Sequence, residues 1–252
     1  MTYVNVSAKG GVATLVLCRG KVNALDAPTI DELKDRFREL EADEAVRAVV
    51  FSGEGKFFSF GFDIPGFLGH SRPDFSRFLT KFTDLYTYLF TYPKPVIAAL
   101  NGHTVAGGLM LALACDRRIM TAEKGKVALN ELAFGSSVFA GSVEMLRFAV
   151  GNRNAEEILY AGAMYLPEEA LRLGLVDEVC SGEELLRKAV ATARDLGGKS
   201  PPAFQSMKRL LRGPVAEGMR RREGASITEF VDIWYSEATW SCLLYTSPSP
   251  RD

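Results

Sequence analysis

The chain has 252 residues, of which 47% are hydrophobic and 24% are charged, and its formal net charge is −1. This length and composition allow a sizeable core, in one large domain or in one domain with a C-terminal addition. The nearly balanced charge gives no overall attraction to nucleic acid or to an anionic membrane surface. No apolar run approaches the roughly 18–20 residues that span a bilayer. We therefore expect no nucleic-acid partner and no membrane association.

The cysteines are spread along the chain without a CxxC pair and without a neighbouring histidine. They are Cys18, Cys115, Cys180 and Cys242. This spacing predicts neither a metal site nor a disulfide framework, and it fits a reducing compartment. The first residues enter a strand-like pattern directly, without the charged and apolar segments of a secretory leader. We therefore expect a soluble, cytoplasmic protein.

Hydrophobic periodicity in the first half of the chain alternates between strand and helix patterns. In chain order we predict a β-hairpin from 3–8 and 12–18, a helix capped by Asp26, a strand at 46–52, a helix at 73–92 that Pro93 ends, and a strand at 95–100. A strand, a helix and a second strand in this order indicate a right-handed crossover. The fold class that follows is a layered α/β arrangement.

The second half contains more helix than strand. In chain order we predict a strand at 117–122, a short apolar stretch at 127–129, helices at 142–150, 153–162 and 166–173, a strand at 175–179, and helices from Glu183 onward with breaks at 200–202 and 213–214. We divide the chain into a core at 1–195, a C-terminal helical region at 196–241 and a tail at 242–252. Because Ser and Pro in the tail exclude a helix, it is either non-native sequence or a genuine flexible end.

Basic residues accumulate in the C-terminal part, after Arg187. They are Lys188, Arg194, Lys199, Lys208, Arg209, Arg212, Arg220, Arg221 and Arg222. Such residues either cover solvated helix faces or form a patch that faces phosphate groups. The sequence leaves both interpretations open.

Two glycine-containing turns follow strand patterns and carry the functional interpretation. The first reads FSFGFD at 58–63, and the second reads VAGG at 105–108, before an apolar helix. Glycines let a ligand approach the backbone, and the first amides of a helix lack partners at its positive end. If the two strands are neighbours, one N–H from each turn can bind a single oxygen and form an oxyanion hole. Alternatively, the second turn only packs its helix against the sheet.

Few side chains in the sequence are candidates for an acid–base group beside such an oxyanion hole. His70 and His103 are the two histidines, and no Gly-x-Ser-x-Gly elbow is present, which disfavours a serine-nucleophile triad. Glu131 is flanked by apolar residues at 127–129 and 132–134, so we expect its pKa to be raised. Glu131 could instead cap a turn.

Several motifs together resemble the enoyl-CoA hydratase/isomerase (crotonase) superfamily. They are FSFGFD at 58–63, NGHTVAGG at 101–108, ACD at 114–116, and LPEEA at 166–170 leading to GLVD at 174–177. The resemblance implies a crotonase-like core of repeated ββα units and a C-terminal helical region that forms a homotrimer or a dimer of trimers. It also implies an acyl-CoA thioester substrate and no metal or redox cofactor, coenzyme A being part of the substrate.

The resemblance also assigns residues by position. The two oxyanion amides fall on Phe62 and Gly107, and Asp63 falls on an aspartate that we interpret as structural. Positions implied in coenzyme A binding are Val22 and Leu25 in the first contacting loop, Lys56 near the adenine–ribose end, and Phe60 and Ile64 along the pocket.

The informative departure from the family pattern is Met110. Family hydratases carry one catalytic Glu at that position and a second at the position of Glu131, and the two activate a water. One carboxylate can still move a proton within a substrate, which resembles the Δ3,Δ2-enoyl-CoA isomerases, so we expect Glu131 to act as base and acid. A hydratase, a dienoyl-CoA isomerase, a thioester hydrolase and a non-catalytic acyl-CoA- or RNA-binding relative remain alternatives.

Overall fold

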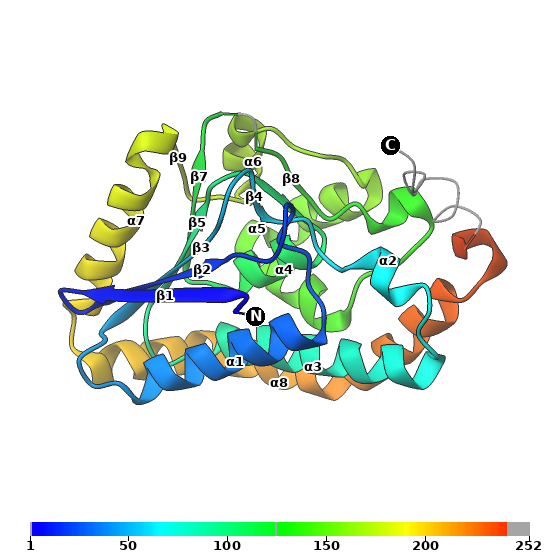
Figure 1. Cartoon of the computed structure of the whole chain (residues 1–252), viewed down its shortest axis with the longest axis horizontal. Coiled ribbons are helices and arrows are strands. Elements are labelled where there is room, and N and C mark those ends of the chain that lie inside the picture. Colours follow the sequence, from blue (N-terminus) through cyan, green and yellow to red (C-terminus); the bar gives the residue numbers. More distant parts are fainter. Residues whose placement is uncertain (1, 124, 241–252) are drawn as a thin grey trace.

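The structure is a computed structural model that describes residues 2–123 and 125–240 (Figure 1). The predicted tail at 242–252 lies outside the described residues. Within them, a larger sheet has six strands in the order β1-β2-β3-β5-β7-β9. Their bounds are β1 (Val4–Lys9), β2 (Val12–Leu17), β3 (Ala48–Gly53), β5 (Val96–Leu100), β7 (Arg117–Thr121) and β9 (Glu178–Cys180). Neighbours are parallel except for the β1–β2 hairpin, which confirms the predicted hairpin.

A smaller parallel sheet lies beside the first and contains the two glycine-turn strands. It consists, in the described residues, of β4 (Phe57–Ser59), β6 (His103–Val105) and β8 (Val127–Ala128) in that order. β4 pairs with β6, with Phe57 opposite His103 and Ser59 opposite Thr104. The condition set by the sequence, that the strands before the two turns are neighbours, is therefore met.

The helices enclose these sheets on both sides. They are α1 (Ala27–Ala42), α2 (Ile64–Phe67), α3 (Arg72–Phe90), α4 (Gly107–Ala114), the 3₁₀ turn η1 (Glu131–Phe134), α5 (Ala140–Ala161), α6 (Pro167–Leu173), α7 (Gly182–Gly197) and α8 (Pro201–Trp234). α7 packs on one face of the larger sheet, while α1, α3 and α8 run side by side across the other part of the molecule (Figure 1). None of the helices in the described ranges is long and apolar enough to cross a membrane.

The chain order confirms the repeated ββα core. Three times the chain leaves a strand of the larger sheet, adds a strand to the smaller sheet and continues into helix. The pairs are β3–β4 before α2 and α3, β5–β6 before α4, and β7–β8 before η1 and α5. Each repeat therefore delivers the end of a small-sheet strand, and the turn after it, to the same edge.

Three predictions about the C-terminal half are wrong in detail. The strand predicted at 175–179 is the shorter β9, because Leu175 closes the end of α6 by donating its N–H to the Ala170 carbonyl. The helices predicted at 142–150 and 153–162 join as α5 across a kink at Gly151, whose φ is 76°. The break predicted at 213–214 is absent, and Pro214 lies inside α8. Packing of α8 against α3 and α5 outweighs the lost hydrogen bond there.

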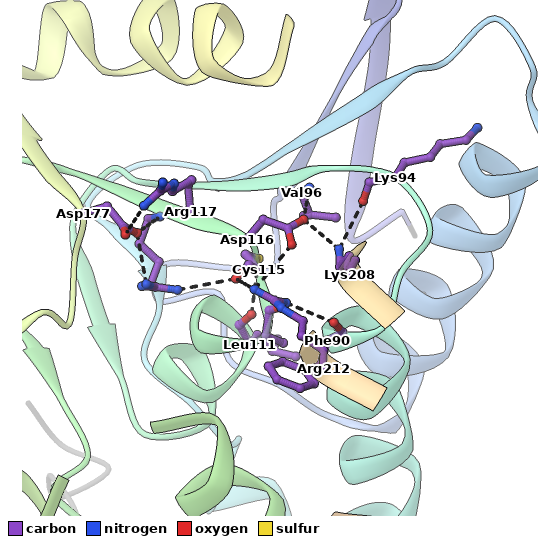
Figure 2. A network of polar contacts seen from close by, with 12 residues as sticks. Phe90, Lys94, Val96, Leu111, Cys115, Asp116, Arg117, Asp177, Lys208 and Arg212 are labelled. Atoms are coloured by element: carbon purple, nitrogen blue, oxygen red, sulfur yellow. Dashed lines mark hydrogen bonds and ion pairs between the residues drawn. The ribbon is translucent and has the colours of Figure 1, made fainter. Parts of the chain in front are cut away.

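A buried ionic network ties α8 to the sheet and to the end of α4. Lys208 Nζ lies 2.7 Å from Asp116 Oδ2, and Arg212 lies 3.4 Å from Asp116 Oδ1 (Figure 2). Asp116 also accepts the Val96 N–H at 2.8 Å. Arg212 donates to the carbonyls of Phe90, Ala114 and Cys115. The network fixes the C-terminal end of α4, whose N-terminus carries the second glycine turn.

Other members of the basic cluster are paired with acidic side chains. Lys188 binds Glu178, Lys199 binds Asp195 and Arg222 binds Glu144. Together with the buried Lys208 and Arg212, this pairing removes much of the positive surface that a phosphate-facing patch would need. The structure favours solvated helix faces over a phosphate-facing patch, and it shows that Lys208 and Arg212 form buried ion pairs.

Asp116→Asn should lower the free energy of unfolding by about 3–5 kcal/mol, because it leaves Lys208 and Arg212 buried without a counter-charge. Urea unfolding of both proteins measures the difference. Asp195→Asn, in the exposed Lys199–Asp195 pair, is the control and should leave stability nearly unchanged. Equal effects of the two substitutions would show that the Asp116 network does not hold α8 in place.

Candidate active site

The two glycine turns approach each other closely enough to exclude side chains. Gly61 has a φ of 90°, and a Cβ built on it would lie 3.2 Å from the Gly107 nitrogen and 3.1 Å from the Val105 carbonyl oxygen. A Cβ on Gly108 would overlap the Ser59 carbonyl oxygen. The glycines are therefore required by the contact between the turns, and not only by local turn geometry.

Ala106 sets the direction of the first amide of α4. Its φ is 51° and its ψ is −122°, a conformation that costs a residue with a Cβ about 1–3 kcal/mol. A hydrogen bond from its N–H to the Ala128 carbonyl, 2.8 Å long, holds it there. This strain could not be predicted from the sequence, since alanine does not mark positive-φ backbone as glycine does.

The amides of Phe62 and Gly107 are free to bind an external oxygen. In residues 2–123 and 125–240, neither N–H has an acceptor within the protein, whereas their neighbours do: Asp63 donates to the Leu25 carbonyl at 3.0 Å and Ala106 donates to Ala128. The Phe62 ring also contacts Gly107, since a Cβ there would lie 3.0 Å from the ring. Two unpaired amides on adjoining turns can stabilise a negative charge that develops on an acyl oxygen.

A cavity of about 630 Å³ opens beside these turns and is largely apolar. Its volume lies within the range of roughly 300–1,000 Å³ that is usual for small-molecule sites. The wall is formed by Val22, Ala24, Phe60, Phe62, Asp63, Ile64, Pro65, Val105, Ala106, Gly107, Met110, Asn130, Glu131, Ala133, Phe134, Phe139 and Phe230. The structure thus brings Glu131, Phe62 and Gly107, the three residues predicted for catalysis, to one cavity.

Glu131 reaches the cavity from η1, directly after β8. Only 5% of the residue is exposed, and its Oε2 atom is buried without a hydrogen-bond partner in the described chain. Burial raises the pKa of Glu131 to about 8. Its backbone carbonyl accepts the Ser136 N–H at 2.9 Å, while its carboxyl group caps no helix. A carboxyl group with a pKa near neutrality can both take up and release a proton.

The other acidic group on the wall, Asp63, is held by structural contacts. It accepts from Arg19 at 2.7 Å and from the Gly66 N–H at 3.4 Å, which caps α2. Arg19 also binds Asp26, the cap of α1, so one guanidinium joins two helix starts. The structural interpretation of Asp63 fits these contacts. Met110 is buried on the same wall, where a thioether cannot exchange a proton.

The residues expected to bind coenzyme A fall into two groups. Val22, Phe60 and Ile64 line the cavity, and Phe60 is 48% exposed at its opening. Leu25 and Lys56 do not line it: Leu25 is buried in the core, and Lys56 is exposed beside the start of β6, where its carbonyl accepts the His103 N–H. Contacts of Leu25 and Lys56 with a ligand stay predictions.

Asn130 and Phe230 are among the wall residues to which the sequence patterns assigned no role. Asn130 precedes Glu131, and its Oδ1 atom is buried without a partner in the described residues. Phe230 belongs to α8 and lies about a hundred positions or more further along the chain than Glu131 and Gly107. Its position in an amphipathic helix marks it as core, and nothing local indicates a cavity.

Comparison with known proteins identifies the family. The family model described as enoyl-CoA hydratase/isomerase matches residues 7–234, so the chain belongs to this family, within the crotonase superfamily. It is 36% identical over 214 residues to a probable enoyl-CoA hydratase of Bacillus subtilis, which covers 84% of this chain and 82% of that protein. It is 33% identical over 239 residues to carnitinyl-CoA dehydratase of Salmonella typhi, with 93% and 91% covered.

The fold matches solved structures of the same family. Human mitochondrial delta3-delta2-enoyl-CoA isomerase superimposes with a TM-score of 0.91 at 27% identity, over 97% of this chain and 96% of that one. The protein is therefore an acyl-CoA enzyme of the crotonase type. Its relatives carry both hydratase and isomerase names, so the family alone does not choose the reaction.

Glu131→Gln should stabilise the protein increasingly as the pH rises from about 4.5 to about 8. The folded pKa is raised, so the folded state holds its proton longer than the unfolded state, and ionisation in this window lowers the stability of the wild type. Each unit of pKa difference is worth about 1.4 kcal/mol, giving a total of a few kcal/mol. Urea unfolding across this pH range measures the difference.

The matched control for this measurement is Glu229→Gln, which alters an exposed glutamate on α8. Its stability relative to the wild type should not change with pH. Parallel pH curves for the wild type and Glu131→Gln would contradict the burial of an unpaired carboxyl group at this position.

Proposed function

We propose that the protein is an enoyl-CoA isomerase that moves a 3-double bond of an enoyl-CoA to the 2-position. The observation that carries this proposal is the single uncommitted carboxyl group on the cavity wall, Glu131, in the part of the chain that the structure describes. Met110 stands where a second acid would be needed to activate water, and Asp63 is engaged with Arg19. One proton carrier suffices for a double-bond shift, because the proton that leaves one carbon of the substrate can be returned to another carbon.

The proposed reaction uses Glu131 twice. In the first step, ionised Glu131 takes a proton from C2 of the 3-enoyl-CoA, and the electron pair moves to the thioester oxygen to give a dienolate. The Phe62 and Gly107 amides stabilise the negative oxygen, a contribution that is worth several kcal/mol in comparable sites. In the second step, Glu131 returns the proton to C4, the double bond forms between C2 and C3, and the carboxylate is restored.

The pKa of Glu131 supports this double role. A carboxyl group with a pKa of about 8 is partly ionised at neutral pH. Its ionised form is basic enough to accept a proton from the carbon beside a thioester. Because the surrounding wall is apolar, the amide dipoles act in a medium that screens them weakly. The reaction changes no oxidation state, so we propose that it needs no metal or redox cofactor.

A hydratase is the second candidate, and one observation favours it. Asn130 Oδ1 and Glu131 Oε2 are both buried without partners in the described chain, and they belong to consecutive residues on the cavity wall. A water bound between them would satisfy both groups. We place this candidate second because a single carboxyl group would have to orient that water and also supply a proton.

An exposed apolar row on α8 supports a homo-oligomer. Met207, Leu210 and Leu211 are 64%, 74% and 65% exposed and share one face of the helix. Apolar rows of this kind mark protein contacts more often than free surface. We propose that they lie between subunits of the homotrimer, or dimer of trimers, expected from the sequence.

The free thiols support the expected location. Cys18, Cys115 and Cys180 are unpaired in the described residues, and burial raises the pKa of Cys115 to about 12. Thiols in this state fit a reducing compartment. We therefore propose a cytoplasmic protein.

Incubation with a 3-enoyl-CoA and, separately, with a 2-enoyl-CoA tests the proposed function. The wild type should convert the first to 2-enoyl-CoA and should form little 3-hydroxyacyl-CoA from the second. Glu131→Gln should lower kcat/KM for the first reaction by about 10²–10⁴-fold, the usual contribution of a general acid–base group. Glu229→Gln, on the surface of α8, should keep wild-type rates. Rapid hydration of the 2-enoyl-CoA, or full turnover without Glu131, would contradict the proposal.

A further inference from the structure

The cavity has an open end and a deep end. Phe60, half exposed, and Pro65 on the exposed side of α2 lie at the opening. Phe139, Phe230 and Met110 are 0%, 3% and 1% exposed and form the deep end. Glu131, 5% exposed, and the turn amides belong to the same cavity wall, so a ligand that enters at Phe60 and Pro65 can contact the reactive groups and the buried rings together.

Phe139 and Phe230 form a fixed wall at that deep end. Their ring centroids are 4.6 Å apart, and they come from separate elements, the cap of α5 and the last third of α8. Behind Phe230, Trp234 stacks at 6.1 Å and packs on Phe75 at 4.9 Å. Phe82 of α3 packs behind Phe139 at 6.2 Å. Because these backing rings are fully buried and close-packed, the wall has little room to retreat.

We infer that the Phe139–Phe230 wall limits the substrate to short, unsubstituted acyl tails and rejects long-chain acyl-CoAs. This inference rests on the proposed function in so far as the ligand is an acyl thioester. The phosphate groups of coenzyme A are charged and must stay at the open end, which leaves only the acyl tail to enter the deep end. There the tail meets two phenyl rings and a thioether.

The chemistry of the deep end also selects against polar tails. Met110, Phe139 and Phe230 offer no hydrogen-bond donor or acceptor to a hydroxyl or carboxylate on the tail. A hydrocarbon tail gains about fourfold in affinity for each methylene that it buries, until it reaches the wall. The next methylene has to displace packed aromatic rings, so affinity should fall sharply beyond that length.

Binding of saturated acyl-CoAs tests the wall without relying on catalysis. Calorimetry with butanoyl-, hexanoyl-, octanoyl- and dodecanoyl-CoA should show affinity that rises with length, passes an optimum and falls by at least tenfold at dodecanoyl-CoA. Phe230→Leu should improve dodecanoyl-CoA relative to hexanoyl-CoA by about tenfold, and Phe139→Leu provides a second variant with the same expected direction. Phe37→Leu alters a buried ring of α1 that packs on Phe51 and Tyr92, away from the cavity wall and the rings behind it, and should leave the optimum unchanged.

Each outcome bears on the wall or on the reaction separately. Dodecanoyl-CoA binding as tightly as octanoyl-CoA in the wild type would overturn the inference, and so would an optimum that moves equally in Phe37→Leu and Phe230→Leu. If the protein shows the expected binding series but does not isomerise 3-enoyl-CoAs, the length limit set by the wall stands and only the proposed function is contradicted.

Discussion

The parallel pairing of β4 with β6 is the constraint on which the rest of the site depends. It sets the turns after these strands side by side at a distance that only glycine allows, with a Cβ on Gly108 overlapping the Ser59 carbonyl oxygen. The third strand, β8, continues the same sheet and delivers Glu131 to the same edge. Repetition of a ββα unit therefore gathers two amides and one carboxyl group that lie far apart in the sequence. The Asp116 network then holds α4 and α8 in place around them.

Burial of Glu131 without a partner is unfavourable for folding and useful for chemistry. A carboxyl group in water would be almost fully ionised at neutral pH and a weak base, whereas burial brings the pKa of Glu131 to about 8. The same apolar wall that raises this pKa surrounds the Phe62 and Gly107 amides with a medium that screens their dipoles weakly. Met110, at the position where a second acid would be needed to activate water, adds another apolar side chain to that wall. One proton carrier in an apolar cavity suits a proton shift within a substrate better than the addition of water.

Local patterns in the sequence predicted most of the elements, whereas long-range packing decides where those patterns fail. The apolar flanks of Glu131 predicted a raised pKa, and burial does raise it, although Leu132 is 57% exposed and the cavity wall also includes the distant Met110. Pro214 was expected to end a helix, yet α8 continues through it, since packing on two other helices outweighs local preference. Lys208 belongs to a basic stretch that is typical of a solvated helix face, but in the structure it is buried against Asp116. Phe230 reaches the cavity only through the tertiary course of α8.

In the proposed reaction one carboxyl group carries the proton from C2 to C4, and an isotope-transfer experiment can follow that proton. A 3-enoyl-CoA that carries deuterium at C2 would be converted in ordinary water, and the position of deuterium in the 2-enoyl-CoA product would be read by mass spectrometry and NMR. Because Glu131 is buried and its cavity is apolar, we expect part of the deuterium to reach C4 within one turnover. A product whose new C4 hydrogen comes only from solvent would contradict a single shielded carrier and would point to separate acid and base groups.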